Sequence, residues 1–542
     1  MLQPAGNYDT LKSTFRWSLP DRYNMAGAVS DSWAAKDPGR LAIRHVLDDG
    51  SHRDWSHLAL NRAANRFANA LAANGIGRGD RVALLLPQIP QTAIAHLAAY
   101  KLGAIAVPLA ALFGLEALRY RLSDSGAKAL VTDTAGLAKL AEIRDDLPEL
   151  GFVVSVDGPE TGVAGFDALL SAASDSFETL ASGPDDPALM IYTSGTTGQP
   201  KGVLHGHRVL AGHLPGIELS QNFLGREGDL LWTPADWAWA GGLLNALFPA
   251  LALGVPVICH AARKFDPEFA YRLLESQGVR NAFIPPTALK MLRAVDRPGK
   301  RFRLDWRSVG SAGEALGSET YDWFVEEFGF PVNEFYGQTE CNAVLGSAAA
   351  LGISRSGAIG KPTPGHEVAI IDGEGRPLGA DSLGQIAVRR PDPVMFLEYW
   401  NKPDATREKF IGDWMITGDQ GVMDEDGYVH FVGRDDDIIT SASYRIGPGE
   451  IEDCLLKHPA VTLAAAIGKP DPLRTEIVKA YVVLKPGGKP GDGLKDDIRE
   501  FVRTRLSAHE YPREIEFVDS LPMTTTGKII RGKLRDLART EG

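Results

Sequence analysis

The chain has 542 residues, too long for one ordinary domain, and the length predicts roughly three to five structural units. With 57 basic and 69 acidic residues, the formal net charge of −12 gives no support for a general nucleic-acid binder. A composition of 44% hydrophobic and 23% charged residues excludes a mostly disordered or fibrous chain. The three widely spaced cysteines (Cys259, Cys341 and Cys454) exclude a disulfide framework and indicate a reduced, cytoplasm-like compartment.

Neither a targeting segment nor a membrane span is expected. Residues 1–23 lack an apolar stretch after a basic start, so a secretory signal is not predicted. The most apolar run, residues 243–259, is slightly short for the about 20 residues that a bilayer needs, and Asn245, Pro249, Gly254 and Pro256 interrupt it. The run predicts a core helix followed by a core strand.

Helix-like and strand-like segments alternate through the first half of the chain. Apolar spacing predicts helices at 57–76 and 92–104 and strands at 81–87, 105–110 and 128–134. A second series has strands at 256–261 and 281–286 with a helix at 267–278 between them. Such alternation predicts an α/β fold, here a large N-terminal lobe of two helix-covered, mostly parallel sheets.

The pattern changes twice in the second half. From about residue 357 the chain is rich in Gly and Pro with short alternating strands, which predicts a small β-barrel-like subdomain. After residues 433–437 we expect helices at 450–458 and 494–506, strands at 462–468 and 476–485, and a loop at 486–493. The predicted division is an N-terminal domain of residues 1–435 and a small mobile α+β domain of residues 436–542.

The strongest local signal is a loop rich in Gly and hydroxyl residues after an apolar strand at 188–192. Glycines let backbone N–H groups approach phosphate oxygens, hydroxyls add donors, and Lys201 adds a cation. The spacing differs from that of a Walker A loop. The loop residues predicted to bind phosphate are Thr193, Ser194, Gly195, Thr196, Thr197 and Gly198.

Residues 192–202, YTSGTTGQPKG, resemble the nucleotide loop of the adenylate-forming superfamily, which includes acyl-CoA synthetases, peptide-synthetase adenylation domains and firefly-type luciferases. Four further blocks, at 311–316, 333–340, 414–439 and 521–535, follow in family order, so the resemblance covers nearly the whole chain. Medium-chain acyl-CoA synthetases look most similar. The resemblance implies that ATP, with Mg²⁺, activates a carboxylic acid to an acyl-adenylate and pyrophosphate. The acyl group then passes to coenzyme A.

The resemblance also implies roles for individual residues. Lys528 would bridge the carboxylate and the α-phosphate, and some relatives are regulated by acetylation at this lysine. Glu340, beside Thr339, would hold Mg²⁺. Asp419 and Arg434 would bind the ribose and Arg445 the phosphates. The remaining nucleotide-binding candidates are Gly313, Glu314, Ala315, Glu334, Phe335, Tyr336, Gly337 and Gln338.

A rotation of the C-terminal domain about Asp436 is implied between the two half-reactions. Residues 440–452 resemble the block that lines the pantetheine tunnel, where this chain has Ala442, Ser443 and Tyr444. Ser443 stands where the family has glycine. The tunnel tolerates the serine, or the serine slows the thioester step and leaves adenylation intact, or it replaces an original residue.

The acyl pocket is predicted to be deeper than acetate needs, because Gly337 stands where acetate-specific relatives have a tryptophan. Trp237, Trp239 and Gly242 are candidates for its wall, with core packing as the alternative for each. We expect a medium-chain fatty acid, or alternatively an aromatic acid such as benzoate or a short branched acid. We also expect a Gly337→Trp change to shift the preference towards acetate.

Other functions stay open at this point: loading of a carrier protein in trans, or a nucleotide sensor without turnover. Expected partners are small molecules (a carboxylic acid, ATP and coenzyme A) and no nucleic acid, with the chain as a monomer or a homo-oligomer.

Overall fold

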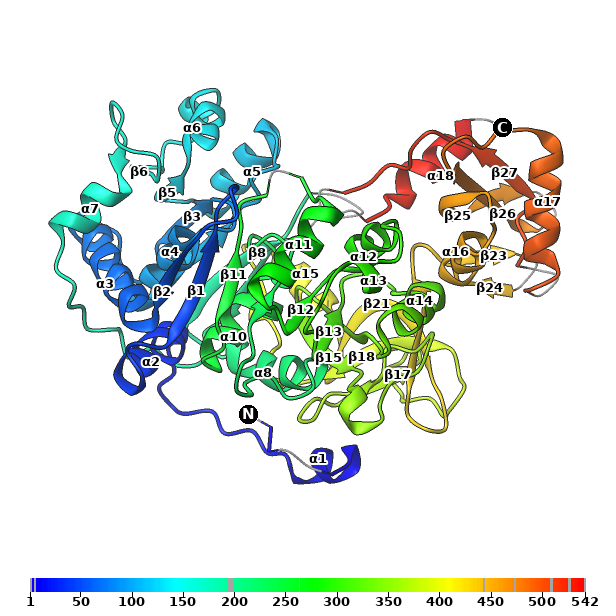
Figure 1. The fold of residues 1–542 in the computed structure, drawn as a ribbon, viewed down its shortest axis with the longest axis horizontal. Coiled ribbons are helices and arrows are strands. Elements are labelled where there is room, and N and C mark those ends of the chain that lie inside the picture. Colours follow the sequence, from blue (N-terminus) through cyan, green and yellow to red (C-terminus); the bar gives the residue numbers. More distant parts are fainter. Residues whose placement is uncertain are drawn as a thin grey trace.

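The computed structural model describes residues 2–3, 6–193, 199–262, 264–441, 444–471, 474–506, 510–524 and 528–540. Figure 1 shows a large lobe that contains most of the chain and a smaller unit formed by its C-terminal part. The predicted α/β fold is confirmed. Within the described ranges, no helix combines the length and the apolar character needed to cross a membrane.

One mixed sheet of eight strands is built mainly from the first 200 residues. Its order is β19-β9-β8-β4-β3-β5-β6-β7, and the strands from β8 to β7 are parallel. Helices α3 (His57–Ala73) and α4 (Pro90–Leu102) pack in its core, as the spacing predicted. The strands are β3 (Arg81–Leu85), β4 (Ile105–Pro108), β5 (Ala129–Thr132), β6 (Phe152–Ser155), β7 (Ala164–Gly165), β8 (Pro187–Tyr192), β9 (Gly202–Gly206) and β19 (Glu398–Tyr399).

A second sheet has nine strands in the order β16-β15-β14-β13-β12-β10-β11-β1-β2. Its central strands are parallel, whereas β2, β15 and β16 at its two ends are antiparallel. The strands are β1 (Leu41–Val46), β2 (His52–Ser56), β10 (Leu231–Trp232), β11 (Val257–Cys259), β12 (Asn281–Phe283), β13 (Ser308–Ser311), β14 (Asn333–Gln338), β15 (Cys341–Gly346) and β16 (Lys361–Pro362).

Helices link the strands of this second sheet. The apolar run at 243–259 is a buried helical stretch, η3 (Leu243–Leu247) and α10 (Phe248–Ala252), followed by strand β11, as expected. The helix predicted at 267–278 is α11 (Pro267–Gln277). Two further helices, α12 (Pro286–Arg293) and α14 (Ser318–Phe328), follow β12 and β13 and border the candidate site.

The β-rich unit predicted after residue 357 is an antiparallel sheet of five strands. It contains β17 (Val368–Ile371), β18 (Gly384–Arg389), β20 (Phe410–Ile411), β21 (Trp414–Met423) and β22 (Val429–Arg434). The short helix α15 (Pro403–Glu408) leads into β20. The long strand β21 pairs with β18, β20 and β22, so it ties the sheet together.

The C-terminal unit has its own sheet and its own apolar core. Its strands are β23 (Ile439–Ser441), β24 (Tyr444–Ile446), β25 (Val461–Asp471), β26 (Thr475–Leu484) and β27 (Glu514–Phe517). Helices α16 (Pro448–Leu456), α17 (Asp492–Arg503) and α18 (Arg531–Thr540) cover it. Helix α17 starts inside the segment predicted as a loop. The boundary between residues 435 and 436 stays a prediction.

Candidate nucleotide and acyl site

A tight hairpin presents two of the predicted residues at the end of a central strand. Gln338 pairs with Cys341, so Thr339 and Glu340 form the turn between β14 and β15. Strand β14 runs parallel to β13, and ligands of open α/β sheets bind beyond the carboxyl ends of such strands. The hairpin therefore places the Glu340 carboxylate, which is 8% exposed, at the edge where a ligand is expected.

Glu340 is linked to Lys201 through a tyrosine that sequence reasoning missed. Tyr399 Oη donates to Glu340 Oε1 at 2.5 Å, and burial together with this carboxylate raises the pKa of Tyr399. Lys201 Nζ lies 4.9 Å from the centre of the Tyr399 ring. Three segments distant in sequence thus meet here: Lys201 just before β9, Tyr399 on β19 and Glu340 in the hairpin turn.

The donor set at Glu340 fits Mg²⁺ that is shared with a nucleotide. Mg²⁺ is commonly held by one or two carboxylates, with substrate phosphates and water completing its six ligands. Nowhere in the described part of the chain do three metal-ligating side chains form a cluster. A single carboxylate therefore suits a cation that arrives with phosphate oxygens better than a resident structural metal.

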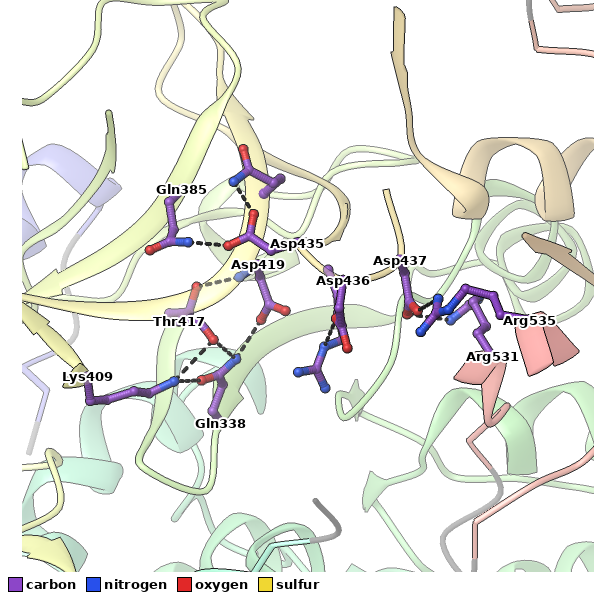
Figure 2. A network of polar contacts seen from close by, with 12 residues as sticks. Gln338, Gln385, Lys409, Thr417, Asp419, Asp435, Asp436, Asp437, Arg531 and Arg535 are labelled. Atoms are coloured by element: carbon purple, nitrogen blue, oxygen red, sulfur yellow. Dashed lines mark hydrogen bonds and ion pairs between the residues drawn. The ribbon is translucent and has the colours of Figure 1, made fainter. Parts of the chain in front are cut away.

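Asp419 lies in β21. Its side chain is buried and accepts hydrogen bonds from residues of the hairpin strand β14. Its Oδ2 accepts hydrogen bonds from Tyr336 Oη at 2.5 Å and from Gln338 Nε2 at 2.7 Å. Figure 2 shows the bond from Gln338. Burial raises the pKa of Asp419, while these hydrogen bonds and the nearby charge of Arg434 oppose the shift. Both side-chain bonds end on Oδ2, which leaves Oδ1 to face a ligand hydroxyl.

Lys528 reaches this group of residues from the C-terminal unit. Its own backbone N donates to Thr524 Oγ1 at 3.0 Å, which shapes the loop before α18. Lys528 as a whole residue is exposed. Partial desolvation lowers the pKa of Lys528, whereas the carboxylates of Glu314 and Asp419 raise it. Lys528 thus lies within electrostatic range of Glu314 and Asp419.

The other predicted nucleotide residues divide into two groups. Glu314, Glu334, Gly313 and Ala315 lie around the segment after β13, and Glu334 Oε1 accepts from the backbone N of Leu316 at 3.1 Å. Burial raises the pKa of Glu334 to about 7. In contrast, the Phe335 side chain packs in the apolar core against Phe283 at 5.6 Å, so only its backbone is available to a ligand at this edge.

The three candidates for the wall of the acyl pocket differ in burial and packing. Trp237 is fully buried in the apolar core. Trp239 is half-buried, with its ring edge-on to Phe113 at 5.6 Å. At Gly242 a Cβ would lie 2.3 Å from the carbonyl oxygen of Asp236, so close backbone packing requires glycine. Of these, Trp239 is the best placed to contact a ligand.

Gly337 has a packing reason for its identity that sequence reasoning did not foresee. A Cβ at this position would lie 2.3 Å from Asn342 Cα and 2.6 Å from the backbone N of Ala343. Contacts this short with backbone force the hairpin to move. A Gly337→Trp change would therefore disturb the β14–β15 hairpin, and it is a poor probe of acyl chain length.

Several predicted residues lie outside the described part of the chain. The base of the phosphate loop is described: the Thr193 backbone N donates to the Lys201 carbonyl at 3.0 Å, between the antiparallel strands β8 and β9. The undescribed candidates are Ser194, Gly195, Thr196, Thr197, Gly198, Ala442 and Ser443, together with the side chains of Tyr444 and Arg445.

Three consecutive aspartates at the joint are anchored in three different ways, and Figure 2 shows the arrangement. The Asp435 carboxylate accepts from Gln385 and Gln420, both in the β-rich sheet of the large lobe. Asp437 instead pairs with Arg535 at 2.6 Å and Arg531 at 3.4 Å, both on α18. Asp436 lies between them and accepts from Arg434 at 3.1 Å. The two anchors bracket the predicted hinge residue.

Two family models match the chain. The first is described as AMP-binding enzyme and matches residues 30–400, and the second is described as AMP-binding enzyme C-terminal domain and matches residues 450–528. The chain is 33% identical to mouse acyl-coenzyme A synthetase ACSM3, mitochondrial, over 98% of this chain and 93% of that protein. It is 35% identical to the acetyl-coenzyme A synthetase of Bacillus subtilis (strain 168), over 98% and 94%.

Solved structures agree with these matches. The anthranilate CoA ligase AuaEII, in complex with anthranoyl-AMP, superimposes with a TM-score of 0.88 at 29% identity over 96% of this chain and 98% of that chain. The large lobe and the C-terminal unit are both covered. The chain therefore belongs to the AMP-binding enzyme family and is an AMP-forming acid–CoA ligase.

Proposed function

We propose that the protein is an acyl-CoA synthetase for an apolar carboxylic acid, first a medium-chain fatty acid and second an aromatic acid. The observation that carries the proposal is the hairpin site, where Asp419 accepts hydrogen bonds from Tyr336 and Gln338. Lys528 of the C-terminal unit lies within electrostatic range of Asp419 and Glu314. A lysine cation near the nucleotide site suits the joining of an acid to ATP, because both reactants are anions.

The first half-reaction joins the substrate carboxylate to the α-phosphorus of ATP, and the bond from that phosphorus to the pyrophosphate oxygen breaks. Both reactants are anions, so positioning and charge neutralisation dominate. We assign Lys528 to the carboxylate and α-phosphate and residues 193–198, with Lys201, to the departing phosphates. Mg²⁺, held by Glu340 beside Thr339, would supply positive charge at those phosphates.

Nucleotide binding is assigned to the hairpin and its neighbours. The free Oδ1 of Asp419 is placed to accept from a ribose hydroxyl, and Arg434 lies across the β21–β22 ladder from it. Tyr336 is half-buried and fixed through its hydroxyl to Asp419, so its ring is held in one position for stacking on adenine. Arg445 stays a proposal for the phosphates.

The second half-reaction requires the coenzyme A thiolate to attack the acyl carbonyl, releasing AMP and forming the thioester. Lys528 occupies the joint in this structure, so a route for coenzyme A requires the C-terminal unit to move. We assign the pivot to Asp436, between the anchored residues Asp435 and Asp437. Residues 442–444 would then line the path of the thiol. Ser443 is the residue in this path that differs from the glycine of the family.

The acid is assigned from the relatives and from the residues near the acyl site. The named relatives act on acetate in one case and anthranilate in another, so the family accommodates small and aromatic acids. Position 337 carries no side chain that could close an acyl pocket, and the half-buried Trp239 supplies an apolar aromatic surface. These features favour an apolar acid larger than acetate. A cytoplasmic location and control by acetylation of Lys528 are proposed with the same function.

A panel of acids tests the proposal. Acetate, butyrate, octanoate and benzoate, each with ATP, Mg²⁺ and coenzyme A, should give AMP and thioester in equal amounts, with octanoate or benzoate as the best substrate. Highest activity with acetate would overturn the pocket assignment, and absence of acid-dependent pyrophosphate release would overturn the enzyme assignment. Thioester formed only on an added carrier protein would favour carrier loading.

Ser443→Gly, measured in both half-reactions separately, tests the tunnel. If serine hinders the thiol, the glycine variant should speed thioester formation and leave pyrophosphate release unchanged. If the Ser443→Gly variant and the unaltered protein have the same rate in each half-reaction, the tunnel tolerates serine.

A further inference from the structure

A second lysine, Lys409, lies beside the candidate nucleotide site and has no role among those assigned above. It follows helix α15, and its side chain turns inward to the hairpin strand. Lys409 Nζ donates to Gln338 Oε1 at 3.3 Å and to the Thr417 carbonyl at 3.2 Å. Figure 2 shows this chain of contacts running from Lys409 through Gln338 to Asp419.

The direction of these hydrogen bonds is set by what each group can do. An ammonium group only donates, so it selects the oxygen end of the Gln338 amide. The nitrogen end must then face the opposite way, where it donates to Asp419 Oδ2 at 2.7 Å and to the Thr417 carbonyl at 2.8 Å. Without a donor at position 409, the Gln338 oxygen would lose this partner, and the amide would be held only through its nitrogen.

The charged groups that act on Lys409 belong to the candidate nucleotide site. Its pKa is lowered by desolvation and raised by Glu340 and Asp419, while Arg434 and Lys201 lower it further. The ammonium therefore interacts with the carboxylates assigned to Mg²⁺ and to the ribose. It forms a direct hydrogen bond to neither of them, so its action on Asp419 passes through Gln338.

We propose that Lys409 is a positioning residue of the nucleotide site: it fixes the Gln338 amide, which holds the Asp419 carboxylate with one oxygen directed to the ribose. The proposal rests on the proposed function, since it takes Asp419 as the ribose acceptor. It assigns Lys409 to nucleotide affinity, and not to the transfer of the acyl or adenylyl group.

Lys409→Met keeps the length of the side chain and removes the donor. We expect the Kd for AMP, measured by calorimetry, and the KM for ATP to rise about tenfold, in the range for loss of a charged hydrogen bond, with kcat changed less than about threefold. Lys409→Arg retains a cationic donor and should restore at least half of the lost affinity on a logarithmic scale. The KM for the acid should not move in either variant.

A double-variant cycle tests the route of the effect. Because Lys409 acts through Gln338, the pair Lys409→Met and Gln338→Ala should bind AMP no more weakly than Gln338→Ala alone. The matched control is Arg407→Met, on the helix α15 that precedes Lys409, because the exposed Arg407 side chain pairs with Asp404. Arg407→Met should leave AMP affinity unchanged.

Three outcomes overturn the proposal: fully additive losses in the double variant, a fall in kcat with unchanged AMP affinity, or no restoration by arginine. These are distinct from failure of the proposed function, in which the unaltered protein itself binds no AMP and releases no pyrophosphate.

Discussion

Ser318 and Asp453 join the two lobes, with Ser318 Oγ donating to Asp453 Oδ2 at 2.5 Å. Ser318 begins helix α14 of the large lobe, and Asp453 lies on α16 of the C-terminal unit. The residue before Ser318 is a glycine, which has no side chain to cap the helix, and the backbone N of Glu319 lies 3.4 Å from Asp453 Oδ1. A carboxylate of one lobe thus caps a helix of the other.

Asp453→Ala should weaken the docking that brings Lys528 to the nucleotide site. Loss of a helix cap costs about 1 kcal/mol, which corresponds to about a fivefold shift in the docking equilibrium. Acid-dependent pyrophosphate exchange should fall, up to about fivefold, while thioester formation from supplied acyl-adenylate should hold or rise. Asp492→Ala, at an exposed site on α17, is the control and should change neither rate. Equal losses in both half-reactions would contradict the prediction.

The anchors around Asp436 predict a difference between its two neighbours. Asp437→Asn removes the charge that pairs with Arg531 and Arg535, so amide hydrogen exchange in α18 should speed up and the adenylation rate should fall. Asp435→Asn acts on Gln385 and Gln420 of the large lobe and should leave α18 protected. Comparable exchange in the two variants would show that Asp437 does not tie the Lys528 segment to the joint.

Periodicity predicted the helices and parallel strands well, because α3, β3, β4 and β5 are local elements whose apolar spacing follows from the face that each one buries. The hinge contacts could not be predicted in this way. Asp437 meets Arg535 across 98 residues, and no spacing rule links positions so far apart.

The site itself was predicted through motifs, and its supporting residues were missed. Tyr399 and Lys409 lie in a segment without a chemical signal of its own, and only the fold brings them to Glu340 and Gln338. Gly337 illustrates the reverse case. Its motif suggested pocket depth, whereas the structure adds a close backbone contact with Asn342 that alone would require glycine.

The two tryptophans near the acyl site should separate stability from specificity. Trp237 is fully buried, so Trp237→Ala should lower the free energy of unfolding by about 3–5 kcal/mol, as measured in denaturant. Trp239 is half-buried against Phe113, so Trp239→Ala should cost less stability and raise kcat/KM for longer or branched acids relative to butyrate. An unchanged order of acids in the Trp239 variant would place Trp239 outside the acyl pocket.

Glu334 should make the stability of the protein depend on pH in a defined direction. Burial raises its pKa from 4.5 to about 7, so the folded state binds a proton more tightly than the unfolded state. The stabilisation present below pH 4.5 is therefore lost as pH rises towards 7, by about 3 kcal/mol for a shift of this size.

Glu334→Gln keeps an oxygen that can accept from the backbone N of Leu316 and removes the titration. The free energy of unfolding of the unaltered protein, minus that of the variant, should therefore decrease between pH 4.5 and 7 and level off above it. A difference that stays constant over this range would mean that the pKa of Glu334 is the same in the folded and the unfolded protein. In that case water or a cation, and not the protonated acid, satisfies the buried carboxyl beside the proposed adenine site.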